Sequence, residues 1–257
     1  MKNNINTIPN LSTKQVSLQN LLDEDCSRQA DGLLCQGNEN PVNRNDNHRE
    51  EKNLGILFLD IRNSTGLLQA GNESQAVDLL NKVLDLFSRV IVGFGGRVVD
   101  RTGDNLYAVF GLHSTISQAA NVAFESANML FELLVHVNKQ YYNARFGKDL
   151  RIGIGIHAGR VIVDHGSGFS AMGLAVNLAA RLQTETKNAN NDLLLSDDFY
   201  KLLFPEKIQG HWELRENVQL KGIEQPQTIW LAGLPYLGLT DKSDEPDDLL
   251  FWLSVAG

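Results

Sequence analysis

Residues 54–65 read LGILFLDIRNST, a short apolar run that ends in the carboxylate of Asp60 and is followed by small polar residues. A run of this length with polar flanks is typical of a strand buried in a sheet. Polar residues between a strand and a helix can present backbone N–H groups to an anion, although a plain helix cap uses the same residue types. Asn63, Ser64 and Thr65 are therefore candidate anion-binding residues.

Beyond this run, the sequence alternates between helical and strand patterns. Residues 95–111, GGRVVDRTGDNLYAVFG, predict a helix stop followed by two strands with a tight turn at Gly103-Asp104. The other expected elements are a helix over 73–92, a helix over 117–138, a long strand or hairpin over 149–166 with a bend at 158–159, a helix over 175–186, a strand over 192–195, a short helix over 198–203, and strands over 211–220 and 228–233. The buried face of the helix over 73–92 is expected to contain Val77, Leu80, Leu84, Phe87 and Ile91. This alternation assigns the chain to the α/β or α+β class.

The chain divides into three segments by composition. Residues 1–52 are rich in Asn, Gln, Asp and Ser, and they bury too little apolar surface to offset the entropy of ordering. We therefore expect a largely disordered leader, a folded domain over 53–233, and an acidic, turn-rich tail over 234–257. The two cysteines, Cys26 and Cys35, fall in the leader, where reduced thiols of a cytoplasmic protein are preferred to a disulfide.

Charge and hydropathy exclude several classes of partner. The formal net charge of -8 argues against binding to nucleic acid or to an anionic membrane surface. It permits a nucleotide substrate, because a bound divalent cation reverses the local sign of the field. No apolar run reaches the roughly 20 residues that span a bilayer, and no apolar segment follows Lys2, so we expect neither a membrane span nor a secretory signal.

Two pairs of polar residues are candidates for chemistry. Asp60 and Asp104 each sit where an apolar strand ends, and two neighbouring carboxylates repel unless a cation lies between them. Asn177 and Arg181 are four residues apart on one helix face, and the guanidinium suits phosphate. Taken singly, a turn cap for each aspartate and an ordinary polar face for the helix pair remain the simpler readings.

Taken in order, five segments are much more specific: LFLDIRNST, GGRVVDRTGDNLYAVFG, IGIGIHAGRV, GFSAMGLAVNLAARL and QLKGI. This series resembles the catalytic domain of class III adenylate and guanylate cyclases over about residues 54–233. The resemblance implies an α+β sandwich with a ferredoxin-like βαββαβ core, related to polymerase palm domains, and a C-terminal extension. It also implies a head-to-tail homodimer in which two chains share each active site.

The same resemblance implies a role for each candidate residue. Asp60, Ile61 and Asp104 would bind two Mg²⁺ or Mn²⁺ ions, Asn177 would orient the ribose, Arg181 would stabilise charge on the transferring phosphate, and Lys221 would contact the terminal phosphates. The anion-binding residues of the first segment would then contact the triphosphate. The implied reaction is attack of the ribose 3′-hydroxyl on the α-phosphorus of a nucleoside triphosphate, with loss of pyrophosphate.

The sequence departs from the family at the positions that read the base, which align to Asp100 and Ser170. Adenylate cyclases usually have Lys with Asp or Thr there, and guanylate cyclases have Glu with Cys or a small polar residue. An ionised Asp100 accepts hydrogen bonds only, so it could accept from any of the four bases, or it could simply anchor the hairpin. Ser64 is a further departure, because the family usually has Phe in this DIRGFT-like segment.

Three functional hypotheses follow. The absence of a visible sensor domain and of the base-reading Lys resembles the antiphage pyrimidine cyclases (Pycsar systems), which make cyclic CMP or cyclic UMP and act on an effector gated by the cyclic nucleotide. We therefore expect a pyrimidine triphosphate as the substrate, with ATP as the second candidate and GTP as the third. A degenerate cyclase that only binds nucleotide is the alternative from another class, whereas a diguanylate cyclase lacks its GGDEF-like turn.

Overall fold

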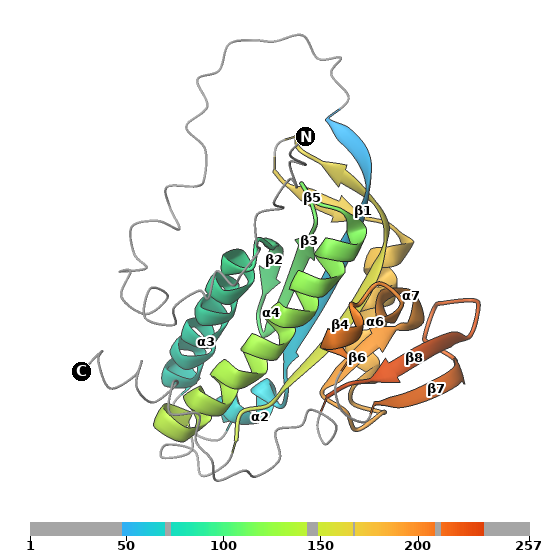
Figure 1. Ribbon diagram of the computed structural model, residues 1–257. Helices are drawn as coiled ribbons and strands as arrows, with labels where there is room; N and C mark the ends of the chain where they lie inside the picture. Colours follow the sequence, from blue (N-terminus) through green and yellow to red (C-terminus); the bar gives the residue numbers. More distant parts are fainter. Residues whose placement is uncertain (1–47, 70–72, 143–148, 167, 209–211, 234–257) are drawn as a thin grey trace, which may run out of the picture.

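The computed structural model describes residues 48–69, 73–142, 149–166, 168–208 and 212–233 (Figure 1). The predictions for residues 1–47 and for the tail over 234–257 lie outside the described residues. Within the described ranges, every helix is too short or too polar to cross a lipid bilayer.

The described elements follow the expected alternation of strands and helices. In chain order they are β1 (Arg49–Ile61), α2 (Ser64–Gln69), α3 (Glu73–Gly93), β2 (Arg97–Thr102), β3 (Asn105–Phe110), α4 (Ile116–Val137), a π-helical turn (Asn138–Tyr142), β4 (Ile152–Asp164), β5 (Ser170–Met172), α6 (Leu174–Glu185), β6 (Leu193–Ser196), α7 (Asp197–Tyr200), a 3-10 turn (Pro205–Lys207), β7 (Glu213–Val218) and β8 (Gln227–Leu231).

These strands form one mixed sheet with the order β2-β3-β1-β4-β6-β8-β7, and β5 pairs with the end of β4. The first four strands are antiparallel neighbours, whereas β6 runs parallel to β4. The segment from β1 to β4 is therefore a βαββαβ unit with the strand order 2-3-1-4, which is the ferredoxin-like arrangement. The expected α+β fold and its C-terminal extension, formed by β6, β7 and β8, are confirmed.

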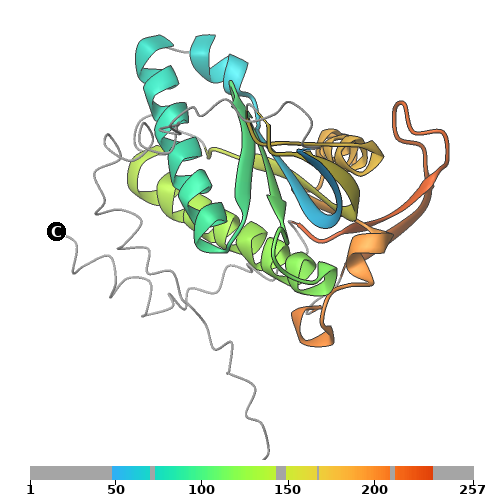
Figure 2. The ribbon, with the colours of Figure 1, turned by 90° about the horizontal axis from the view of Figure 1, so that it is seen from above.

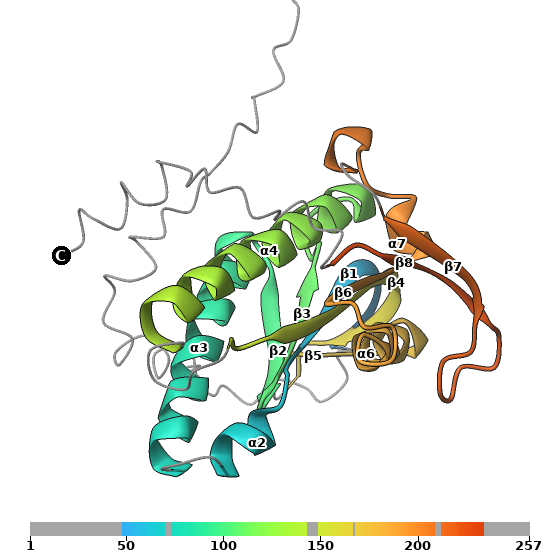
Figure 3. The same cartoon turned by 90° about the horizontal axis from the view of Figure 1, so that it is seen from below.

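The two faces of the sheet are covered by different helices (Figures 2 and 3). Helices α3 and α4 pack on one face, where they bury Leu57, Leu59 and Ile61 of β1. Helix α6 packs on the other face, where its Ala175 and Ala179 join a smaller cluster with Leu54 and Ile56. Because side chains alternate along a strand, Asp60 lies on the same face as Ile56, the α6 face.

The structure corrects three details of the sequence prediction and decides between two alternatives for a fourth. Strand β1 begins at Arg49, five residues before Leu54. Its first five residues pair with residues 160–164 of β4, but they are polar and so give no apolar pattern in the sequence. Of the two alternatives for residues 149–166, the long strand is confirmed, since Ile152–Asp164 form one continuous strand. In α3, Val77 is 42% exposed and Ala76 is buried instead. Ala76 lies four residues before Leu80, so the two residues share the helix face that meets the sheet. The short helix expected over 198–203 is only Asp197–Tyr200, capped by Ser196.

Candidate active site

The carboxylates of Asp60 and Asp104 lie at one edge of the sheet, as the sequence predicted. Asp60 is opposite Asn105 in the β1–β3 register, and the backbone N–H of Ile61 donates to the carbonyl oxygen of Asp104 at 3.1 Å. Asp104 sits in the β2–β3 turn, which Gly103 makes with a φ of +61° that glycine adopts readily. The antiparallel pairing thus brings the end of one strand and a hairpin turn together.

The two carboxylates have different surroundings. Asp104 accepts hydrogen bonds from the Ser64 hydroxyl and, at 2.9 Å, from the Asn105 side-chain amide. Asp60 is only 6% exposed, and within the described residues no hydrogen bond reaches its Oδ2. The ammonium nitrogen of Lys187 lies 2.9 Å from this oxygen. A buried carboxylate is costly unless it is paired, and the ammonium of Lys187 is the partner that Asp60 has here.

The loop that follows Asp60 is tied to the turn that follows α6. The guanidinium of Arg62 donates to Asp192 Oδ1 at 3.2 Å and to the carbonyl oxygen of Asn191 at 3.0 Å. Arg151 donates to both oxygens of the same buried Asp192 at 2.9 and 3.1 Å. Two arginines thus compensate one buried carboxylate, which fixes the relative position of the two loops. Sequence reasoning missed this network, since its members are far apart in the chain.

The three candidate anion-binding residues precede or begin α2. Asn63 has a φ of +56°, and its carbonyl oxygen accepts from the N–H of Leu67 at 3.0 Å. Ser64 is buried and points its hydroxyl at Asp104, whereas Thr65 is exposed. Ser64, where the family usually has Phe, therefore donates its hydroxyl to Asp104, a candidate metal ligand.

Asn177 and Arg181 share the exposed side of α6. The opposite side of the helix is buried against the sheet through Ala175, Leu178, Ala179 and Leu182. The helix approaches β4 very closely at Gly155, where an added Cβ would lie 2.1 Å from the backbone nitrogen of Gln183. Lys221 is also exposed, in the turn between β7 and β8.

A hydrogen bond links the neighbourhoods of the two base-reading candidates, Asp100 and Ser170. Tyr107, opposite Asp100 in the register of β2 and β3, donates its hydroxyl at 2.9 Å to the carbonyl oxygen of Ala171, the neighbour of Ser170. Burial raises the pKa of Tyr107, so its phenol remains a donor. The Tyr107 ring also stacks on Phe58, with centroids 4.5 Å apart. These contacts of Tyr107 therefore join β3, β1 and β5 beside the two candidate residues.

Asp100 lies on the same side of the sheet as Tyr107 because β2 has a bulge. The register shifts between Val98 and Asp100, so that Arg101 turns towards α3 and contacts Asp85 and Asn81. Asp100 is exposed and accepts from the N–H of Arg101 at 2.8 Å and from Thr102. These contacts fit the interpretation that Asp100 anchors the hairpin. They also leave its carboxylate exposed beside Tyr107.

Strand β4 contains a buried histidine. His157 is 6% exposed, and its Nδ1 is 2.7 Å from the hydroxyl oxygen of Ser196. Burial lowers the pKa of His157 to about 4, although the charge of Asp198 opposes the shift. The imidazole is therefore neutral at physiological pH and acts as a packed polar group.

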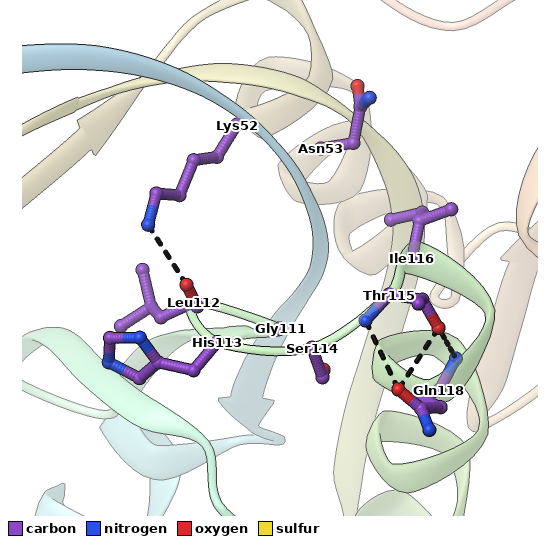
Figure 4. A pocket seen from close by; sticks show the side chains of 9 residues that line it. All are labelled: Lys52, Asn53, Gly111, Leu112, His113, Ser114, Thr115, Ile116 and Gln118. Carbon is purple, nitrogen blue, oxygen red and sulfur yellow. Dashed lines mark hydrogen bonds between the residues drawn. The ribbon is translucent and has the colours of Figure 1, made fainter.

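A hollow at the other end of β1 is separate from the carboxylate pair. It is lined by Lys52, Asn53 and the loop from Gly111 to Gln118 (Figure 4). Lys52 and Asp60 are eight residues apart on one strand, which corresponds to about 26 Å at the rise of an extended chain. Lys52 donates to the carbonyl oxygen of Leu112 at 2.9 Å, and Thr115 and Gln118 form a reciprocal cap of α4. The polar groups here serve the loop and the helix end.

The fold and the residues at its edge define a class of protein. Residues 47–233 match the family model for the adenylate and guanylate cyclase catalytic domain, and the chain therefore belongs to this family. The recognition made from the five ordered segments is confirmed.

Solved cyclase structures agree with this assignment, and the chain is also similar to uncharacterized curated proteins. The adenylyl cyclase CyaB from P. aeruginosa is 26% identical with a TM-score of 0.63, covering 71% of this chain and 94% of that one. The guanylyl cyclase Cya2 is 26% identical with a TM-score of 0.62, covering 73% and 96%. The uncharacterized protein Rv1319c of Mycobacterium tuberculosis is 27% identical over 185 residues, which are 70% of this chain and 33% of that protein. The chain thus spans about a third of the length of the curated relatives that it matches first.

Proposed function

We propose that the chain is an active class III nucleotidyl cyclase that converts a nucleoside triphosphate into a 3′,5′-cyclic monophosphate and pyrophosphate. The observation on which this rests is the pairing of Asp60 with the Asp104 turn at one sheet edge, beside an α6 that displays Asn177 and Arg181. A module that only binds nucleotide would need neither the acidic pair nor the arginine in this arrangement.

The donor set at this edge fits hard divalent cations. Among the described residues, no group of three or more His, Cys, Asp or Glu side chains is arranged to hold a metal ion. A pair of carboxylates nevertheless suits Mg²⁺ or Mn²⁺ when substrate phosphates complete the coordination. Asp60 already attracts a cation, the ammonium of Lys187. Asp60, Asp104 and Ile61 would hold two such ions, which would supply Lewis-acid polarisation of the phosphates and lower the pKa of the ribose hydroxyl.

The remaining candidates would position the triphosphate. In the reaction, a bond forms between the ribose O3′ and the α-phosphorus as the bond from that phosphorus to the bridging oxygen breaks. The hydroxyl proton leaves O3′, and pyrophosphate departs with the electron pair. Asn177 would hold the ribose by hydrogen bonds, while Arg181 would neutralise charge that develops on the α-phosphate. Lys221 would bind the leaving pyrophosphate as a point charge.

The proposed site is shared between two copies of the chain in a head-to-tail homodimer. Asn177 and Arg181 are exposed on the side of α6 away from its buried contacts with the sheet that contains Asp60. A second copy could bring its own α6 over the acidic edge. The exposed Asp100 on the α6 face of the sheet would then lie in the same interface.

The base is a finer question, and our proposal remains a pyrimidine triphosphate, with antiphage signalling through a cyclic-nucleotide-gated effector. Its support is Asp100, an exposed acceptor where adenylate cyclases have a lysine donor. The solved relatives named above are adenylyl and guanylyl cyclases, which favour ATP or GTP as the competing substrates.

One experiment tests all of these alternatives. The purified full chain is incubated with Mn²⁺ and each of the four ribonucleoside triphosphates, and the products are identified by mass spectrometry, with Asp60→Ala as the inactive control. A cyclic pyrimidine nucleotide that the control does not form supports the cyclase and its pyrimidine substrate. Selective formation of cyclic AMP or cyclic GMP would retain the cyclase and discard the pyrimidine. No cyclic product from any substrate would favour the nucleotide-binding module.

A further inference from the structure

Lys187 is a charged residue that the proposed reaction does not use, although it contacts the proposed metal site. Its ammonium nitrogen lies 2.9 Å from Asp60 Oδ2, while its side chain is 57% exposed and that of Asp60 is 9% exposed. An exposed lysine therefore reaches from solvent onto a nearly buried carboxylate. No other described side chain makes an ion pair or hydrogen bond with this oxygen.

The turn that bears Lys187 is held firmly against the loop that follows Asp60. Thr186 is fully buried, and its carbonyl oxygen accepts from the N–H of Asn191 at 3.1 Å. The carbonyl oxygen of Asn191 and the carboxylate of Asp192 both bind Arg62, two residues after Asp60. The same network therefore fixes the backbone of this turn near Asp60, while the exposed side chain of Lys187 is free to leave the carboxylate.

We propose that Lys187 is the resident counter-ion of Asp60, which a divalent cation must displace in order to bind. This inference rests on the proposed metal site. The ammonium nitrogen of Lys187 already compensates the buried charge of Asp60, and it competes with a metal ion for the same oxygen. Lys187 thus lowers the affinity for the metal and delays its binding until nucleotide phosphates add their own ligands.

The test measures metal binding directly, without nucleotide and without turnover. The full chain is titrated with Mn²⁺, and free Mn²⁺ is followed by its electron paramagnetic resonance signal. Lys187→Gln is expected to bind Mn²⁺ roughly tenfold more tightly than wild type, because one competing charge beside a divalent ion is removed. Lys187→Arg keeps the charge and should stay near wild type. Lys201→Gln is the matched control, since Lys201 also forms an ion pair, with Asp197, away from this edge.

A second measurement follows the lysine itself. Acylation of lysines by an amine-reactive reagent, located by mass spectrometry, should increase at Lys187 when Mn²⁺ is added and stay constant at Lys201. Equal or weaker Mn²⁺ binding by Lys187→Gln, or no change in Lys187 acylation at saturating Mn²⁺, would overturn the inference. If neither wild type nor Lys187→Gln binds Mn²⁺, the inference also fails. The mass assay for cyclic products then shows separately whether the proposed function stands.

Discussion

Helix α6 can lie very close to β4 because Gly155 has no side chain. A Cβ added there would lie 2.1 Å from the backbone nitrogen of Gln183 and 2.6 Å from the carbonyl oxygen of Ala179. Ordinary Cβ contacts begin near 3.4 Å, so Gly155→Ala must push the helix about 1.3 Å from β4. Because the obstructing atoms are backbone, no side-chain rotamer can relieve the clash.

Gly155→Ala should therefore lower both stability and activity. Overpacking of a core typically costs about 1–3 kcal/mol, and a backbone clash belongs at the upper end. A loss of about 3 kcal/mol corresponds to a fall in Tm of roughly 6–12 °C for a domain of this size. The displaced helix also bears Asn177 and Arg181, and a shift of about 1 Å at reacting groups can cost roughly 100-fold in rate.

The measurement is thermal unfolding by circular dichroism, in parallel with the cyclase assay on the substrate found active. Gly55→Ala is the matched control, because Gly55 is also a strand glycine under a helix but its added Cβ would lie 3.4 Å from Ala119, an ordinary contact. If Gly155→Ala melts within about 2 °C of Gly55→Ala and keeps its activity, the close helix–strand contact does not position the site.

Three further predictions address the shared site, pH and the loop network. Asp60→Ala and Arg181→Ala should each be inactive and should regain activity when mixed, and failure to do so in proven heterodimers would contradict the shared site. The pKa of His157 is about 4 in the folded chain and about 6.5 in the unfolded chain. The neutral imidazole therefore adds about 3 kcal/mol to the free energy of unfolding above pH 6.5, and this is lost as the pH falls towards 4. Urea unfolding should therefore show a smaller loss of stability with acid for His157→Gln than for wild type. Arg62→Ala should destabilise the chain by about 2 kcal/mol in the same assay at pH 7, since Asp192 loses a partner, and an unchanged midpoint would show that the remaining contacts suffice.

The alternation of strands and helices and the acidic pair could be predicted from short-range rules, whereas the ferredoxin-like core was expected only from the resemblance to the cyclase family. An apolar run ending in Asp60 and a hairpin turn at Asp104 are local patterns, and antiparallel pairing then places both at one edge. The same rules failed for the start of β1, where residues 49–53 pair with β4 but are polar and not buried, so they give no apolar signal. Likewise, burial of Ala76 instead of Val77 depended on which helical row meets the sheet.

The sequence by itself thus determined the order of the elements and the family, and it supplied the residues that we propose to bind phosphate and metal. Tertiary structure alone decided that a lysine after α6 lies on Asp60, that two arginines share Asp192, and that a bulge turns Asp100 onto the α6 face. Each of these depends on contacts between segments far apart in the chain, for which periodicity carries no information. The exposure of Asn177 and Arg181 is of the same kind, because a helix pattern shows which residues share a face but not what that face meets.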